Sequence, residues 1–136
     1  MTKLQMAAAH LQFSVERCQS LLDRKIWSPE ELERLESLSS RFARLADLLT
    51  QRVMRTVDYI ELTPDGSLLD RIHRAEKRGW CVEANQLVRM RELRNVIAHE
   101  YAAEKMPELF AAVAKLAPQL LAVIPRVVAY CEKLAR

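Results

Sequence analysis

The feature that most constrains the fold is a stripe of apolar residues, three or four positions apart, that runs from Leu32 to Val53 without a glycine or a proline. Such spacing places the residues on one face of an α-helix. The stripe follows a Ser-Pro-Glu-Glu sequence at 28–31, in which the serine can cap a helix and the second glutamate completes a capping box. We therefore expect one helix from residue 28 to about Glu61. It would be about 45 Å long, which exceeds what a small globule needs and leaves part of it for a partner surface.

Four more helices are predicted from the same signals of apolar spacing, caps and breakers. They cover residues 3–25, 68–78, 82–102 and from 107 nearly to the C-terminus. Ser67 can cap the short second helix of this set, and Gly79 ends it. Pro118 and Pro125 lie within the last helix, and each is expected to kink or break it. Half of the 136 residues are apolar and only two are glycine. We predict a single domain over residues 1–136, folded as an all-α antiparallel bundle of about five helices.

The three cysteines, Cys18, Cys81 and Cys131, argue against a disulfide framework or a zinc site, because their number is odd and no C-x-x-C occurs. We expect them to be reduced, in a cytoplasmic protein. The N-terminus lacks the pattern of a signal peptide, and we expect no membrane-spanning segment. The histidine spacing is not that of a metal site, so we predict neither a metal nor a cofactor.

The segment from Arg94 to Tyr101 carries the side chains best suited to chemistry. It reads R-N-x-x-x-H-x-Y, with Asn95 and His99 inside it. Within a helix these side chains lie within about two turns. An arginine can clamp a phosphate, and a histidine can transfer a proton near neutral pH. These two groups are sufficient in principle to cleave a phosphodiester without a metal.

A straight helix over 82–102 does not bring Arg94 and His99 together. At about 100° per residue, their side chains differ by about 140° around the helix axis. Either the helix distorts near His99, or a second copy supplies the complementary residue across a two-fold axis. The spacing therefore favours a homodimer whose site spans the interface. Tyr101, seven residues from Arg94, would lie nearly on the same face as that arginine.

The motif resembles the R-x4–6-H signature of the HEPN superfamily, and its R-N-x3-H-x-Y form is similar to the HepT-like toxins of HEPN/MNT toxin–antitoxin pairs. The order of a long helix, a loop, a short basic helix and the motif helix is similar as well. The resemblance implies a dimeric, metal-independent endoribonuclease, the toxin of a type VII-like pair. It implies that Arg94 and His99 are catalytic and that Asn95 is the polar residue after the arginine. The implied partner is a nucleotidyltransferase (MNT) antitoxin that attaches AMP to Tyr101.

These roles give a hypothesis for the reaction. The RNA 2′-OH attacks its adjacent phosphate, His99 acts as general base or acid, and Arg94 stabilises the added negative charge. The products would be a 2′,3′-cyclic phosphate and a 5′-OH, and DNA would be inert because it lacks the nucleophile. AMP on Tyr101 would place a phosphate beside Arg94 and occupy the cation that RNA needs.

A basic segment leads into the motif. Between Arg71 and Arg94 the chain has seven arginines and lysines but three glutamates, so this segment carries +4 while the whole chain carries +3. A solvated face is the ordinary interpretation, but the i, i+3 spacing forms a ridge that could follow RNA phosphates. The RNA-binding residues predicted on this basis are Arg71, Arg74, Lys77, Arg78 and Arg91.

Each motif residue also has a structural interpretation. Arg94 could pair with Glu61, Glu92 or another carboxylate. His99 could be favoured by the dipole at the end of a helix, and Tyr101 could belong to the core. A second hypothesis for function is a non-catalytic subunit that binds a nucleotide or substrate for a nucleotidyltransferase. A third is a helical dimer in which the motif forms a salt-bridged interface.

Overall fold

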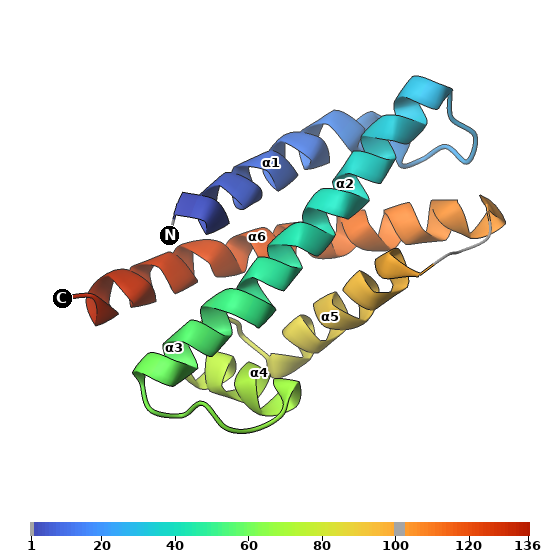
Figure 1. Ribbon diagram of the computed structural model, residues 1–136. Helices are drawn as coiled ribbons and strands as arrows, with labels where there is room; N and C mark the ends of the chain where they lie inside the picture. Colours follow the sequence, from blue (N-terminus) through green and yellow to red (C-terminus); the bar gives the residue numbers. More distant parts are fainter. Residues whose placement is uncertain (1, 100–102) are drawn as a thin grey trace.

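The computed structural model in Figure 1 describes residues 2–99 and 103–136, which form helices and turns with no β-strand among them. The elements are α1 (Thr2–Cys18), η1 (Gln19–Leu21), α2 (Pro29–Asp47), η2 (Leu48–Val53), α3 (Met54–Ile60), α4 (Leu68–Lys77), α5 (Ala84–Ala98), η3 (Ala103–Lys105) and α6 (Met106–Leu134). Because α2, η2 and α3 follow one another without a break, the main helices form five rods. Consecutive long rods run in opposite directions, α1 against α2 and α5 against α6 (Figure 1). The predicted all-α bundle of about five helices is confirmed.

The two serine caps read from the sequence are present. Ser28 Oγ accepts a hydrogen bond from the Glu31 N–H, and the Ser28 N–H donates to Glu31 Oε1 at 2.9 Å. Ser67 and Asp70 form the same reciprocal pair at the start of α4. Gly79 follows α4 with a φ of +81°, a conformation in which a side chain would be strained. These local signals fix where α2 and α4 begin and where α4 ends.

The long rod contains one irregular stretch that the sequence did not predict. The η2 segment is a π-helix, in which the Met54 N–H donates to the carbonyl of Leu49, five residues earlier. Such a turn holds one residue more than an α-turn, so it moves the buried position by one. Val53, expected on the buried face, is only partly buried, whereas Met54 is fully buried. Widened turns of this kind are rare and are often found at functional sites, and this one directly follows Asp47.

The core lies where α1, α2, α5 and α6 face one another. Two tryptophans close the junctions between helices. Trp27 packs edge-on against Phe110, and Trp80 packs edge-on against Tyr130, with ring centroids 5.5 Å apart in each pair. Trp27 also donates its indole N–H to the carbonyl of Leu21 at 2.8 Å. These contacts connect α6 to the turns before α2 and α5.

The last helix is not broken at either proline. The sequence predicts that each proline kinks or breaks it, and the predicted break does not occur. α6 runs uninterrupted from Met106 to Leu134 through Pro118 and Pro125. Both prolines lie on its exposed side, where water can bond the carbonyl groups that lose a helical partner. The segment Ala103–Leu134 contains an 18-residue window with a mean hydropathy of 1.5, so by length and composition this helix could cross a membrane. Its buried residues pack against α1, α2 and α5. The core helix of a soluble protein can have the same length and hydropathy as a membrane-spanning helix.

Two helices end earlier than predicted. α1 ends at Cys18, and a 3-10 turn replaces the last part of the helix expected to reach residue 25. α5 ends at Ala98 rather than at residue 102, and His99 is in an extended conformation with its N–H bonded to the Val96 carbonyl at 3.2 Å. No glycine or proline stands near Ala98 to signal this end.

Candidate functional site

Arg94, the arginine of the motif, is held by Asp47 at the end of α2. Its Nε and Nη2 donate to the two carboxylate oxygens at 2.7 and 2.9 Å, a bidentate pair. Arg91, one turn earlier on α5, donates from Nη1 to Asp47 Oδ1 at 2.9 Å. The sequence suggested Glu61, Glu92 or another carboxylate as a structural partner, and the partner is Asp47. The structure therefore brings two arginines of α5 together on a single carboxylate.

This cluster keeps a net positive charge and free donor capacity. Two guanidinium groups share one carboxylate, and the Nη1 of Arg94 makes no hydrogen bond to a described residue. The hydrogen bonds that Arg94 donates to Asp47 raise the pKa of Arg94 above its ordinary value, despite the opposing effect of burial. The side chains are accessible, with 28% of Arg94 and 35% of Asp47 exposed. The arginine is thus oriented, charged and within reach of a ligand.

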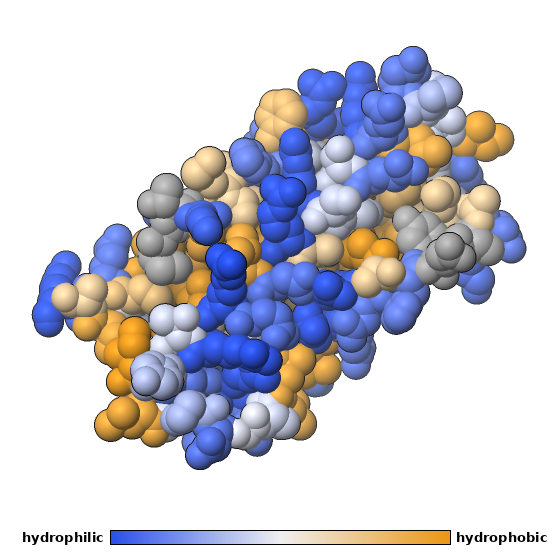
Figure 2. Space-filling view, in the orientation of Figure 1, coloured by the Kyte–Doolittle hydropathy of each residue, from blue (hydrophilic) through white to orange (hydrophobic). Residues whose placement is uncertain are grey.

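The cluster lies in an open groove of about 680 Å³ between the α2–η2 rod and α5. The lining side chains include Arg44, Asp47, Gln51, Arg52, Arg91 and Arg94. Figure 2 shows strongly hydrophilic residues gathered over the middle of the face on which α2 and α3 lie in front. A groove with these donors is suited to an anion, and the planar guanidinium group matches the geometry of carboxylates and phosphates.

The other motif residues are not assembled around Arg94 within one chain. His99 and Asn95 are exposed, and His99 does not line the groove. Since α5 ends at Ala98, the helical arithmetic that set His99 about 140° from Arg94 no longer applies to it. The same arithmetic placed Tyr101 beside Arg94, and Tyr101 lies outside the described residues. The chain does depart from the helix near His99, but His99 does not line the groove that contains Arg94.

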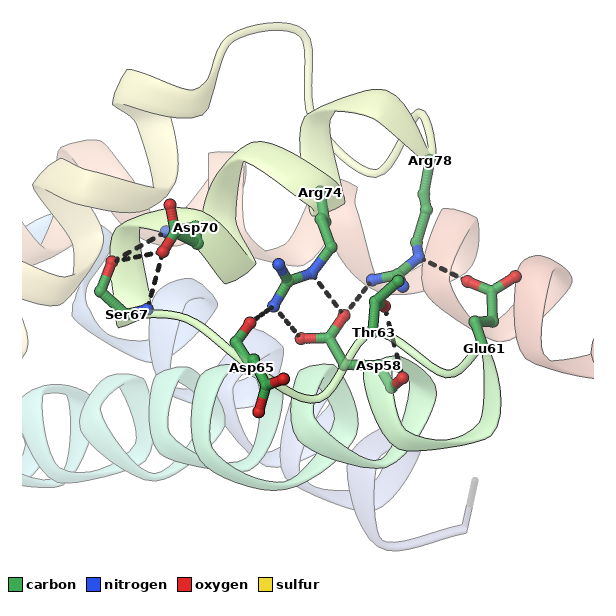
Figure 3. A network of polar contacts seen from close by, with 8 residues as sticks. All are labelled: Asp58, Glu61, Thr63, Asp65, Ser67, Asp70, Arg74 and Arg78. Atoms are coloured by element: carbon green, nitrogen blue, oxygen red, sulfur yellow. Dashed lines mark hydrogen bonds and ion pairs between the residues drawn. The ribbon is translucent and has the colours of Figure 1, made fainter.

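The arginines of the predicted RNA-binding ridge have different surroundings. Arg74 and Arg78 both bind Asp58, and Figure 3 shows the two side chains converging on this carboxylate from α4. Arg78 also pairs with Glu61 at 2.8 Å. With 8% of its side chain exposed, Arg78 is not part of a solvated face. Lys77 between them is exposed. Arg71 is partly buried, and Arg91 belongs to the Asp47 cluster.

Asp47 and Asp58 were the residues that sequence reasoning missed. Asp47 is the one acidic residue from Ser37 to Val57, in a stretch that also holds four arginines. A lone carboxylate among so many cations is expected to be paired, so this signal was available. The pairing of Asp58 was harder to predict from the sequence, because its partners come from α4, beyond a loop.

No group of three or more His, Cys, Asp and Glu side chains that could hold a metal ion occurs in residues 2–99 and 103–136. The three cysteines are free thiols, two of them buried, and burial raises the pKa of each. No family model, curated protein or solved structure matches this chain.

Proposed function

We propose that this protein is the toxin of a type VII-like toxin–antitoxin pair, a metal-independent endoribonuclease that an MNT nucleotidyltransferase neutralises. The observation that carries the proposal is the fixed orientation of Arg94, held by Asp47 in an open, positively charged groove. A cation that is already oriented needs no reorganisation when charge develops on a phosphate, which is the condition for strong transition-state stabilisation. The order of long rod, short basic helix and motif helix agrees with the HEPN resemblance.

In the proposed reaction, the 2′ oxygen of RNA forms a bond to the adjacent phosphorus while the bond to the 5′ oxygen breaks. His99 accepts the 2′-OH proton as general base, or delivers a proton to the leaving 5′ oxygen as general acid. Arg94 stabilises the additional negative charge through the donors that Asp47 leaves available. In a two-fold dimer, a second copy supplies a second histidine, so that one can act as base and the other as acid.

The surface around the end of α5 supports a dimeric site. Asn95 and His99 are exposed, and the apolar side chain of Val96 is 50% exposed between them. A second copy docked here would bring two motifs into one groove.

The test is RNA cleavage by the purified protein, with growth arrest on expression as a second readout. Replacing Arg94 or His99 by alanine should lower the cleavage rate by about 10²- to 10³-fold, while EDTA should have no effect. Arg89→Ala is the matched control, since Arg89 is an exposed base of the same helix that does not line the groove. Cleavage that persists in the folded Arg94→Ala and His99→Ala variants would refute the assignment.

Neutralisation is tested by co-expression with the cognate nucleotidyltransferase. Intact-mass and peptide mass spectrometry should show AMP on Tyr101, and the modified protein should not cleave RNA. Tyr101→Phe should remain toxic in the presence of the transferase. Modification at a different residue with full neutralisation would contradict the proposed site.

A second candidate is a non-catalytic subunit that binds a nucleotide for a nucleotidyltransferase. It is favoured by the same Asp47 cluster, because two arginines around one carboxylate can hold a nucleotide phosphate without a proton carrier. Under this hypothesis, Arg94→Ala abolishes nucleotide binding, His99→Ala leaves it unchanged, and no RNA is cleaved. The His99 variant therefore separates the two functions.

A further inference from the structure

The side chain of Arg71, on α4, has no hydrogen-bond or ion-pair partner among the described residues. Its Nη1 atom is buried and has no hydrogen-bond acceptor among the described residues, and Arg71 forms no ion pair with them. The Nε atom of Arg91 is likewise buried and unsatisfied. Buried donors in proteins nearly always have an acceptor, and those on a charged group cost most when they lack one. Two such donors, on arginines of α4 and α5, mark a place where the described residues supply too few acceptors for the cations present.

The surroundings of Arg71 are strongly positive. Burial lowers the pKa of Arg71, and repulsion from Arg55, Arg74 and Arg91 lowers it further. Asp58 opposes this effect, but it is already bonded to Arg74 and to a second arginine, Arg78. Asp58 therefore compensates Arg71 only in part.

The same imbalance continues into the groove. Four arginines, Arg44, Arg52, Arg91 and Arg94, line the groove together with a single carboxylate, that of Asp47. Arg52, three residues before Arg55, lines the groove together with Arg91 and Arg94. Arg91 is thus common to the groove and to the surroundings of Arg71.

We propose that Arg71, Arg55 and Arg91 form a second phosphate-binding site beside the Arg94 groove, which holds another phosphodiester of the RNA strand being cut. The identity of the ligand rests on the proposed function, whereas the excess charge and the unsatisfied donors do not. Arg91 lies one helical turn, about 4.5 Å along the axis, before Arg94, so a strand crossing α5 at Arg94 passes Arg91 next. Such a contact positions the strand without reading its bases.

Of the α4 residues that the sequence predicts to bind RNA, the proposed site includes only Arg71. Arg74 and Arg78 donate to Asp58 and Glu61, and of these three arginines only Arg71 has a buried donor without an acceptor among the described residues. Arg55 was not in the predicted set, because it comes from α3 and reaches this region only in the folded chain.

The experiment measures binding of a labelled single-stranded DNA oligonucleotide, which has no 2′-OH and cannot be cleaved, by fluorescence anisotropy at several salt concentrations. Arg71→Gln should weaken binding roughly ten-fold and reduce the slope of log K against log salt by about 0.7. Arg89→Gln removes the same charge from an exposed position outside the groove, and should change binding much less. Equal losses in the two variants would overturn the site, as would unchanged binding in Arg71→Gln.

A second measurement is independent of nucleic acid and of folding defects. Inorganic pyrophosphate, at constant ionic strength, should raise the Tm of the wild type and of Arg89→Gln but not of Arg71→Gln. Without ligand, Arg71→Gln should melt at or above the wild-type Tm, since the substitution removes a repelled charge. If poly-glutamate binds as tightly as the oligonucleotide, the nucleic-acid assignment is refuted. If the DNA binds as expected while the wild-type protein does not cleave RNA, the ribonuclease proposal fails and the phosphate site stands.

Discussion

The bundle contains two clusters with the same hydrogen-bond pattern and different surroundings. In each, one arginine donates from Nε and Nη2 to both oxygens of an aspartate, and a second arginine donates from Nη1 to Oδ1 of the same group. In one cluster Arg94 and Arg91 bind Asp47. In the other Arg74 and Arg78 bind Asp58. The aspartates differ in exposure, at 35% for Asp47 and 1% for Asp58.

The difference between the clusters lies in charge balance as much as in burial. Glu61 joins the Asp58 cluster through Arg78, so two cations meet two anions. The Asp47 cluster has two cations and one anion, and it opens into the groove. A neutral, buried cluster joins α3 to α4, whereas a positive, accessible one is available for a ligand. Identical contacts thus serve structure in one place and, we infer, recognition in the other.

The largest expected effect is on stability, from Asp58→Asn. Removing the charge leaves two arginines, one of them buried, around a neutral amide, and we expect a loss of about 3–5 kcal/mol in the free energy of unfolding. The matched change Asp47→Asn should cost about 1 kcal/mol or less, because that pair is partly exposed. Urea denaturation of both variants gives the comparison, and equal losses would show that burial does not separate the clusters.

The Asp58 contribution should also depend on pH. Burial alone would raise the pKa of Asp58, but the hydrogen bonds from Arg74 and Arg78 outweigh it, and the pKa is lowered. The stabilisation is therefore complete above about pH 4, the ordinary pKa of an aspartate in an unfolded chain. It is lost as the pH falls further through the lowered pKa of the folded state. Asp58→Asn should remove this part of the acid dependence.

The second effect is on activity and compares the two bidentate arginines. Arg94→Ala should lower RNA cleavage by about 10²- to 10³-fold while the protein stays folded. Arg74→Ala should lower the free energy of unfolding and leave the rate of the folded fraction near that of the wild type. Cleavage rates corrected for the folded fraction, measured by circular dichroism, test both statements. A large loss of rate in Arg74→Ala would mean that the buried cluster also serves the reaction.

Local sequence patterns predicted where the helices begin, but not which aspartates pair with the arginines of the two clusters. The caps at Ser28 and Ser67 act over three residues, so local patterns were sufficient to place the starts of α2 and α4. The pairs Asp47–Arg94 and Asp58–Arg74 join residues 47 and 16 positions apart, and only the packing of helices brings them together. The π-turn and the end of α5 at Ala98 were missed because neither is marked by a glycine or a proline.

The third expected effect is on the hydrogen bond that connects α6 to the neutral Asp58 cluster. The Tyr130 hydroxyl donates to Glu61 Oε2 at 2.6 Å, and this bond raises the pKa of the tyrosine. Tyr130→Phe keeps the edge-on packing against Trp80 but removes a hydrogen bond to a charged group, with an expected cost of about 1.5 kcal/mol or somewhat more. Thermal or urea unfolding measures it. An unchanged stability would show that Glu61 is satisfied by Arg78 alone.

The smallest expected effect comes from Lys77→Ala. Lys77 lies between Arg74 and Arg78 in the predicted ridge, but it is exposed and has no ion pair among the described residues. Its removal should change the free energy of unfolding by less than about 0.5 kcal/mol and oligonucleotide affinity much less than Arg71→Gln does. If Lys77→Ala weakened binding as strongly as Arg71→Gln, the whole exposed ridge would bind RNA. The division of α4 into a structural pair and a single phosphate-binding arginine would then be wrong.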